Sequence, residues 1–298
     1  MAKKIGFIGV GTMGKPMALN LLKAGYAVTA YDVNPQPLKE LKEKGATIGE
    51  SIAEVASQTE VIITMLPNSA DVETVILGDG GVIGAVKSGS IVVDMSTIDP
   101  STSKKVAAAL SEKGITMLDA PVSGGQWGAE QATLAIMVGG DEGAFKECSD
   151  IFNTMGKNIT YCGANGSGEI VKIVNNLLAA VNFVTTAEAL ALGVKAGVKM
   201  EVLFNAINNS SGQNWAMQNY CPNKAFKGDF EPGFSVALHH KDVGLYMNLA
   251  KDEGAPVFVG SLIHQIYSQY MAAGLGGKDT TVGVKVVEDL LGVQLRLS

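Results

Sequence analysis

The stretch Lys4-Ile5-Gly6-Phe7-Ile8-Gly9-Val10-Gly11-Thr12-Met13-Gly14 decides how the first half of the chain folds. The apolar residues from Ile5 to Ile8 predict a buried strand, and a helical pattern of apolar residues begins directly after the last glycine. Between them the glycines have the spacing Gly9-x-Gly11-x-x-Gly14. This order of strand, glycine turn and helix is typical of a site that binds the pyrophosphate of a dinucleotide at a helix N-terminus.

An acidic residue closes the next predicted strand, which runs from Tyr26 to Tyr31. Asp32 is placed to accept hydrogen bonds from ribose hydroxyls, and its charge would repel the additional phosphate of NADP. The residues that follow Asp32 include no arginine that could receive that phosphate. NAD is therefore the predicted cofactor, with a plain turn residue before Pro35 as the alternative interpretation of Asp32.

Strands and helices alternate along the chain as far as about Gly163. Two apolar strands, Val61 to Leu66 and Ile91 to Met95, end in polar or proline-containing turns. Ligands bind at the carboxyl ends of the strands in such parallel sheets. From this pattern the predicted cofactor-binding residues are Gly9, Val10, Gly11, Thr12, Met13, Gly14, Asp32, Asn34, Met65, Leu66, Pro67 and Thr97.

After Gly163 the strand pattern almost disappears. One long helical pattern runs from about Asn165 to Ala196, which corresponds to about 45 Å of helix. It is apolar on most of its circumference, so we expect other helices to bury it, including those of a partner subunit. The predicted fold is an α/β Rossmann-type domain with a mostly parallel sheet over residues 1–163, followed by an all-α domain for substrate binding and oligomerisation over residues 164–298.

Composition restricts the classes of partner. The 298 residues carry a formal charge of −6, which disfavours nucleic acid as a partner. The three scattered cysteines predict neither a disulfide framework nor a metal site, and they favour the cytoplasm. His239 and His240 are adjacent, so on a helix they point in different directions and do not predict metal ligation. No run of 18 apolar residues exists, and no membrane span is expected.

Lys172 lies in the middle of the apolar long helix. Asn175 and Asn176 follow three and four residues later, near the same helix face. Buried polar groups need partners, so these residues indicate a cavity. Burial would lower the pKa of the lysine from about 10.4 towards neutrality, which suits proton transfer. The alternative is a lysine whose stem packs while its ammonium group reaches solvent.

A glycine-rich segment follows the predicted strand from Ile115 to Asp119. Backbone N–H groups and the hydroxyl in Ser123-Gly124-Gly125 could bind a carboxylate, as a small backbone nest does. The alternative interpretation is an ordinary turn between a strand and a helix.

Four stretches in this order resemble the β-hydroxyacid dehydrogenase family over essentially the whole chain. They are the glycine fingerprint, the stretch from Asp119 to Gly125, the stretch from Gly168 to Asn176 and the stretch from Lys241 to Leu245. The resemblance implies that Lys172 is catalytic, with Asn176 orienting substrate or lysine. It also implies that Ser123, Gly124 and Gly125 bind the substrate carboxylate and that Lys241 lies near both substrate and cofactor.

The resemblance further implies an enzyme that oxidises a small 3-hydroxy acid reversibly with NAD, with Lys172 as general acid and base. The stretches Asn209 to Trp215 and Gly260 to Tyr267 favour 3-hydroxyisobutyrate, which gives methylmalonate semialdehyde. Tartronate semialdehyde, 2-(hydroxymethyl)glutarate, L-serine and a sulfonated aldehyde are the alternatives. Imine reduction is disfavoured by the presence of Lys172, and NAD binding without catalysis is disfavoured by the presence of Lys172, Asn176, Ser123 and Lys241 together. A homodimer or homotetramer is expected.

Overall fold

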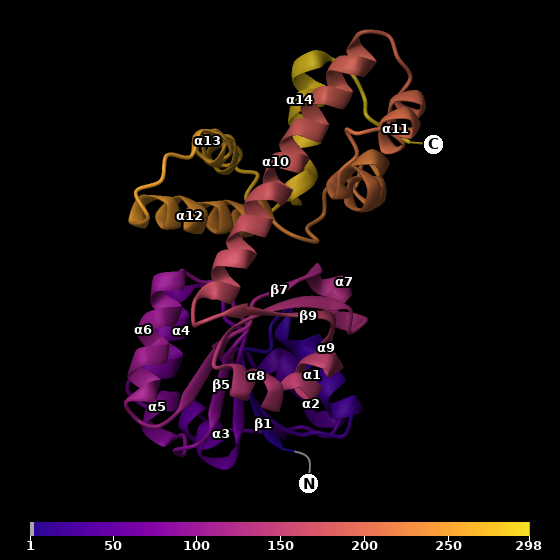
Figure 1. Cartoon of the computed structure of the whole chain (residues 1–298). Coiled ribbons are helices and arrows are strands. Elements are labelled where there is room, and N and C mark those ends of the chain that lie inside the picture. Colours follow the sequence, from indigo (N-terminus) through magenta and orange to yellow (C-terminus); the bar gives the residue numbers. More distant parts are fainter. Residues whose placement is uncertain (1–2, 298) are drawn as a thin grey trace. The chain divides into compact units, whose positions relative to one another are not determined.

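In the computed structural model, which describes residues 3–297, the chain forms two compact units. One unit ends at Lys172 and the other begins at Ile173, so the helix α10 (Ser167–Lys195) contributes to both (Figure 1). Residue 163, after which the sequence predicts the domain boundary, is the last residue of β9 (Gly156–Gly163) and precedes this division by nine residues.

The first unit is built on one sheet whose described strands follow the order β3-β2-β1-β4-β5-β6-β8-β7, with β9 paired to β8. The strand pairs from β3 to β6 are all parallel, whereas β8 is antiparallel to β6 and β7. The prediction of a mostly parallel sheet is confirmed. The strands are β1 (Lys4–Ile8), β2 (Ala27–Tyr31), β3 (Thr47–Ile48), β4 (Val61–Thr64), β5 (Ile91–Asp94), β6 (Thr116–Asp119), β7 (Val122–Ser123), β8 (Leu134–Gly140) and β9.

Helices cover both faces of this sheet (Figure 1). One apolar core lies under α1, α2, α8 and α9, and a second lies under α3 to α6. The strands β4 and β5 are buried on both faces, which explains their uninterrupted apolar sequences. The helices are α1 (Gly14–Lys23), α2 (Pro35–Glu43), α3 (Ile52–Gln58), α4 (Ser69–Leu77), α5 (Val82–Ala85), α6 (Pro100–Ser111), α7 (Gly125–Glu130), α8 (Glu142–Glu147) and α9 (Ser149–Met155).

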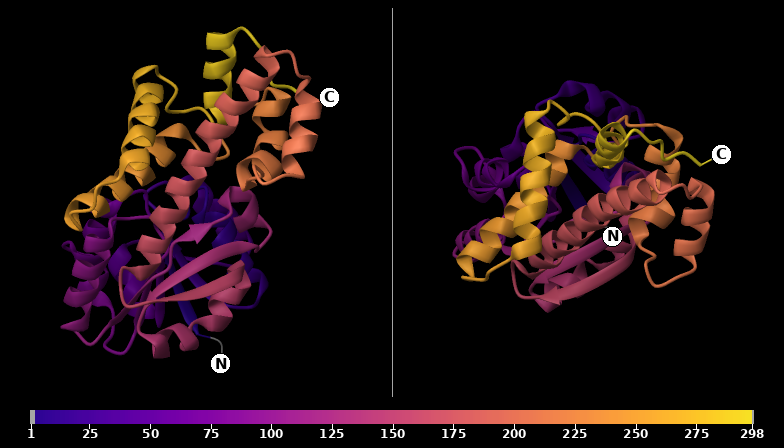
Figure 2. Two further views of the ribbon diagram at one scale, coloured as in Figure 1. Left: turned by 45° about the horizontal axis from the view of Figure 1, so that its top comes forward. Right: turned by 90° about the horizontal axis from the view of Figure 1, so that it is seen from above.

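The second unit is helical, as predicted. Figure 2 shows α12 and α13 side by side, and α14 lies along the C-terminal half of α10. Two apolar cores share α10, one with α11 and α14 and the other with α12 and α13. Besides α10 the elements are α11 (Met200–Asn208), α12 (Val236–Asp252), α13 (Phe258–Ala272), α14 (Gly283–Leu291) and the short turns η1 (Ala216–Tyr220), η2 (Cys221–Asn223), η3 (Ala225–Lys227) and η4 (Thr280–Val282).

One face of α10 stays exposed in the single chain. Its apolar side chains at Val171, Val174, Leu178 and Leu192 are exposed, whereas Phe183 and Leu190 are buried in the cores. By length and composition alone α10 could cross a membrane, since one 18-residue window has a mean hydropathy of 1.7. The core helix of a globular domain meets the same criterion, and 44% of this window is buried inside the chain.

Candidate functional site

The glycine turn after β1 has the geometry that the fingerprint predicts. Gly9 has a φ of +90°, and a Cβ atom there would lie 2.3 Å from the carbonyl oxygen of Met65. A Cβ atom at Gly14 would lie 2.0 Å from the carbonyl oxygen of Gly9. At Gly11, in contrast, a Cβ atom would meet nothing within 4 Å. Gly9 and Gly14 are therefore required for packing, and Gly11 leaves open space beside the backbone, which fits an approaching pyrophosphate.

The helix that follows this turn can bind an anion. Within residues 3–297, no side chain caps α1 at Met13, and no acidic residue lies in the first turn of α1. A helix start without such a cap offers backbone N–H groups and partial positive charge to a phosphate. Thr12 and Met13 belong to this helix start, as the fingerprint requires.

Asp32 fixes the conformation of the glycine turn. One of its carboxylate oxygens accepts a hydrogen bond from the amide of Val10 at 2.7 Å, and the other accepts one from the amide of Asn34 at 2.7 Å. A carboxylate has about four acceptor positions, so two bonds to backbone leave capacity for ribose hydroxyls. The side chain of Asn34 is itself engaged as the N-cap of α2, where it accepts from the amide of Gln36 at 3.0 Å.

The predicted residues after β4 and β5 follow neighbouring strands at the same edge of the sheet as Gly9. The amide of Leu66 donates to the hydroxyl of Ser96 at 2.8 Å, and that hydroxyl donates to the carboxylate of Asp94 at 2.6 Å. This chain of bonds holds the turn that contains Met65, Leu66 and Pro67 next to the turn that contains Thr97. Desolvation by complete burial raises the pKa of Asp94 to about 6.

The segment Ser123-Gly124-Gly125 connects a strand to a helix. Ser123 ends β7, which pairs with β8, and Gly125 begins α7, so the predicted loop is shorter than its sequence indicates. Gly124 has a φ of +135° and Gly125 a φ of +63°, conformations that side chains disfavour. Both glycines are exposed and Ser123 is partly exposed, so their backbone can be reached by a small ligand.

Lys172 is buried, with 7% of its surface exposed, although it carries a charged group. The turn before it is held by Asp119 at the end of β6, whose carboxylate accepts from the amides of Gly166 at 2.7 Å and Glu169 at 3.2 Å. The carboxylate of Glu169 accepts from the amide of Ile98 at 3.2 Å. Lys172 therefore extends from a helix whose first turn is anchored to the carboxyl edge of the sheet.

The prediction that Asn175 shares the buried face of Lys172 is wrong. Asn175 is exposed while Asn176 is 5% exposed, because adjacent side chains on a helix point in directions about 100° apart. The amide group of Asn176 donates to the carboxylate of Asp242 at 2.5 Å and accepts from Asn175 at 3.0 Å. The buried polar pair on α10 thus consists of Lys172 and Asn176, one helical turn apart.

Around Asn176 the second unit contains a polar network on α12. The ammonium nitrogen of Lys241 lies 3.3 Å from the carboxylate of Asp242. His239 is buried, with its ring nitrogens 2.9 Å from the carbonyl oxygen of Asn176 and 2.7 Å from the hydroxyl of Thr280. Our sequence interpretation did not single out Asp242, although it stands directly beside Lys241 in the quoted motif.

Neither histidine of the pair is placed to bind a metal with others. His239 is occupied in the network around Asn176, and His240 stacks on His264 with ring centres 4.9 Å apart. Among the residues from 3 to 297, no group of three or more histidine, cysteine, aspartate or glutamate side chains could hold a metal ion.

The predicted site residues are divided between the two units. The first unit contains the glycine turn, Asp32, Ser123 and Lys172, whereas Asn176 and Lys241 belong to the second. Within the first unit the residues gather at the carboxyl edge of the sheet, and within the second they gather where α10 meets α12.

Comparisons with known proteins identify the family. Residues 4–163 match the NAD binding domain of 6-phosphogluconate dehydrogenase, and residues 166–287 match a model described as NAD-binding of NADP-dependent 3-hydroxyisobutyrate dehydrogenase. The chain is 44% identical to 2-(hydroxymethyl)glutarate dehydrogenase of Eubacterium barkeri, over 98% of this chain and 97% of that protein. It is 42% identical to mitochondrial 3-hydroxyisobutyrate dehydrogenase of Mus musculus, over 94% of this chain and 86% of that protein.

Among solved structures, that of Mycobacterium tuberculosis 3-hydroxyisobutyrate dehydrogenase with L-serine is similar. It aligns with a TM-score of 0.89 and 35% identity, and the alignment covers 96% of this chain and 99% of that chain. Both the sequence and the fold of this chain are therefore similar to these dehydrogenases along nearly its whole length. The chain belongs to the β-hydroxyacid dehydrogenase family of NAD-dependent oxidoreductases.

Proposed function

We propose that this protein oxidises the alcohol of a small 3-hydroxy acid reversibly to the aldehyde, with Lys172 as the general base. The observation that carries the proposal is the burial of Lys172 on a helix anchored at the carboxyl edge of the sheet. A lysine in this position is removed from bulk water yet lies at the edge where parallel α/β sheets bind their ligands.

The residues at the glycine turn fit NAD. Open space at Gly11 and the uncapped start of α1 would accept the pyrophosphate, and Asp32 would accept the ribose hydroxyls. When bound, NAD supplies a hydride acceptor. Leu66, Pro67 and Thr97 would flank the cofactor along the same edge.

In this proposal the proton and the hydride leave the substrate separately. The neutral amine of Lys172 accepts the hydroxyl proton while the carbinol carbon loses its hydride, and the carbon–oxygen single bond becomes a carbonyl. In the reverse direction the ammonium group returns the proton to the oxygen. A general base of this kind contributes typically about 10² to 10⁴ in rate.

The proposed substrate contacts come from the residues that the family resemblance singles out. Backbone amides of Gly124 and Gly125, together with the Ser123 hydroxyl, would bind the substrate carboxylate. Asn176 and Lys241 would supply further polar contacts, with Asp242 fixing the orientation of the Asn176 amide. Such positioning supplies much of the rate acceleration when the reacting atoms are held close together.

The substrate class follows from a chemical unit that the relatives' substrates share. The names of the relatives and of the solved complex refer to 3-hydroxyisobutyrate, 2-(hydroxymethyl)glutarate and L-serine. Each contains a primary alcohol on the carbon next to the one that carries the carboxylate, and they differ in the group on that central carbon. We take 3-hydroxyisobutyrate as the first candidate, with methylmalonate semialdehyde as its product.

Replacement of Lys172 tests the mechanism. Lys172→Ala is expected to lower kcat by at least 100-fold while the dissociation constant for NAD stays within a factor of two. Lys157→Ala, which removes an exposed lysine of β9, serves as the matched control and should retain full turnover. Turnover of Lys172→Ala within tenfold of the parent enzyme would refute the role of Lys172.

A substrate panel tests the specificity. Initial rates are compared for 3-hydroxyisobutyrate, 2-(hydroxymethyl)glutarate, L-serine and the reduced forms of tartronate semialdehyde and a sulfonated aldehyde, each with NAD and with NADP. The highest kcat/KM is expected for 3-hydroxyisobutyrate with NAD. A tenfold preference for another acid would exclude the substrate assignment but leave the reaction class intact.

The proposal extends to assembly and location. The exposed apolar side chains along α10 favour a homo-oligomer in which a second copy covers them. The three cysteines are free, which agrees with a reducing compartment such as the cytoplasm.

A further inference from the structure

A second charged residue is buried on α10 close to Lys172. Glu169 has no exposed surface, and between Ser167 and Ala187 these two are the charged side chains of the helix. Glutamate is almost never completely buried unless it is paired or hydrogen-bonded. Its presence in the first turn of this helix therefore needs a reason.

The backbone around Glu169 is held from several directions. Its amide donates to Asp119 of β6, and its carboxylate accepts from the amide of Ile98, in the turn after β5 that also contains Thr97. Close packing adds a further restraint, since a Cβ atom at Gly168 would lie 2.3 Å from the carbonyl oxygen of Met137. The position of the Glu169 carboxylate is thus fixed by the sheet edge.

The spacing along the helix places Glu169 beside Lys172. Residues three apart on an α-helix are neighbours, with Cβ atoms about 5 to 6 Å apart. Both side chains are buried, so the interaction between their charges is weakly screened. An adjacent carboxylate favours the protonated form of a lysine, whereas burial favours the neutral form.

We infer that Glu169 is a positioning residue for Lys172. Glu169 anchors the first turn of α10 and sets the pH at which the Lys172 amine gains and loses its proton. This inference rests on the proposed function of Lys172. The other charged groups near this turn are Asp119, which faces it from β6, and Lys104 of α6, whose side chain lies against Gly166. Asp94 of β5 lies in register with Asp119, one strand further away.

The substitution Glu169→Gln tests this role, because it removes the charge but keeps a side-chain oxygen that can accept from Ile98. Without the charge, Lys172 should lose its proton more easily. In the oxidation direction, kcat/KM rises with pH as Lys172 becomes neutral. In the variant this rise should occur at a pH lower by about one to two units. In the reduction direction, the limb on which activity falls should move the same way.

The controls separate electrostatic from structural effects. Glu112→Gln neutralises an exposed glutamate of the same unit and should leave the profile unchanged. The dissociation constant for NAD and the thermal midpoint establish that Glu169→Gln is folded. If that variant does not fold, Glu169→Met, a neutral side chain of similar length, replaces it with the same expected shift.

The possible outcomes are distinct. The inference would be overturned if Lys172→Ala abolishes turnover but the pH profile of a folded neutral variant moves by less than about 0.3 pH units, well below the expected shift of about one unit. Retained turnover in Lys172→Ala would instead overturn the proposed function. A shift of the expected sign and size, with Glu112→Gln unchanged, supports the inference.

Discussion

Neutralising Asp94 should change how the stability of the first unit depends on pH. This carboxyl is completely buried at the end of β5. One oxygen accepts from the hydroxyls of Thr64 at 2.7 Å and Ser96 at 2.6 Å, and within residues 3–297 the other oxygen has no hydrogen-bond partner. Burial outweighs these bonds, so the pKa rises from 3.8 to about 6 and the protonated form is favoured in the folded protein.

The sign and the size of the effect follow from this shift. A raised pKa stabilises the fold below pH 3.8, and that contribution is lost as the pH rises through about 6. A shift of about two units corresponds to about 3 kcal/mol. Asp94→Asn resembles the protonated form at every pH, so it does not lose this contribution as the parent does. The difference between the free energies of unfolding of the variant and the parent should therefore rise by about 3 kcal/mol from pH 3.5 to pH 7.5, a window set by the two pKa values.

Urea denaturation at a series of pH values measures this difference. Trp127 lies in the first unit and Trp215 in the second, so a Trp215→Phe background lets fluorescence report on the first unit. Asp79→Asn, which changes an exposed aspartate in the same unit, should run parallel to the parent. The reasoning would be refuted if the free energy of unfolding of Asp94→Asn also follows that of the parent within about 0.5 kcal/mol at every pH, a limit typical of neutral surface changes. Burial would then not raise the pKa of Asp94.

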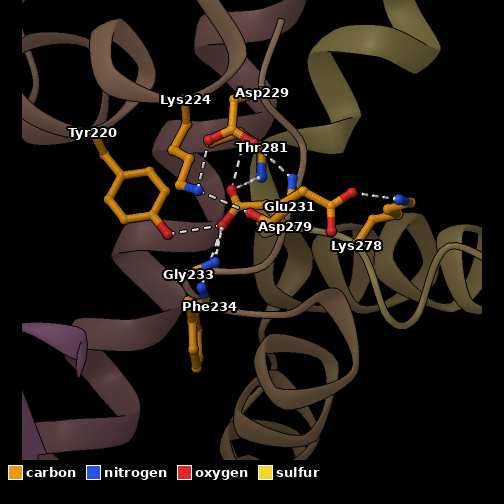
Figure 3. Close-up of polar contacts among 9 residues, drawn as sticks. All are labelled: Tyr220, Lys224, Asp229, Glu231, Gly233, Phe234, Lys278, Asp279 and Thr281. Carbon is orange, nitrogen blue, oxygen red and sulfur yellow. Dashed lines mark hydrogen bonds and ion pairs between the residues drawn. The ribbon is translucent and has the colours of Figure 1, made fainter. Parts of the chain in front are cut away.

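Three further changes test other parts of the structure. Asp32→Ala should raise the dissociation constant for NAD about tenfold or more, through lost ribose contacts and a loosened Val10 amide, and unchanged binding in calorimetry would contradict this. The buried carboxylate of Asp279 accepts five hydrogen bonds, including one from Tyr220 (Figure 3). Asp279→Asn should therefore destabilise the second unit by about 2 to 4 kcal/mol, measured as a lower thermal midpoint. Leu178→Glu should convert a homo-oligomer to monomers in light scattering, and a parent enzyme that is already monomeric would exclude the proposed interface.

The sequence predicted those features that depend on local pattern. The strand predicted from Ile5 to Ile8 and the helix predicted directly after the glycine turn match β1 and α1, because apolar period and glycine spacing act over a few residues. The break between α8 and α9 at Cys148 could not be predicted, because no proline or glycine marks it in the sequence.

Long-range contacts could not be predicted in this way. Nothing in the local pattern shows that Asp119 holds the start of α10, since the atoms that it joins lie 47 residues apart in the chain. The bond between Asn176 and Asp242 spans 66 residues and also depends on how two helices pack. For Asn175, the helical pattern was correct, but a difference of one residue changes the direction of a side chain by about 100°, enough to move it from the buried to the exposed side.

Acidic side chains at the carboxyl edge of the sheet have a common task. Asp32, Asp94 and Asp119 each lie at the end of a strand. Asp32 and Asp119 accept a hydrogen bond from a backbone amide of another turn, and Asp94 accepts one from the amide of Ser96 in the turn that directly follows it. Because an unpaired buried amide is costly, these carboxylates fix the turns before any ligand binds.

The arrangement also explains how a chain with a formal charge of −6 can bind a dinucleotide anion. At the sheet edge these three carboxyl groups are engaged with backbone N–H groups, and the uncapped start of α1 offers partial positive charge to the phosphates. A sequence interpretation that treats each acidic residue only as a ligand group misses this preorganising role, which the fold alone reveals.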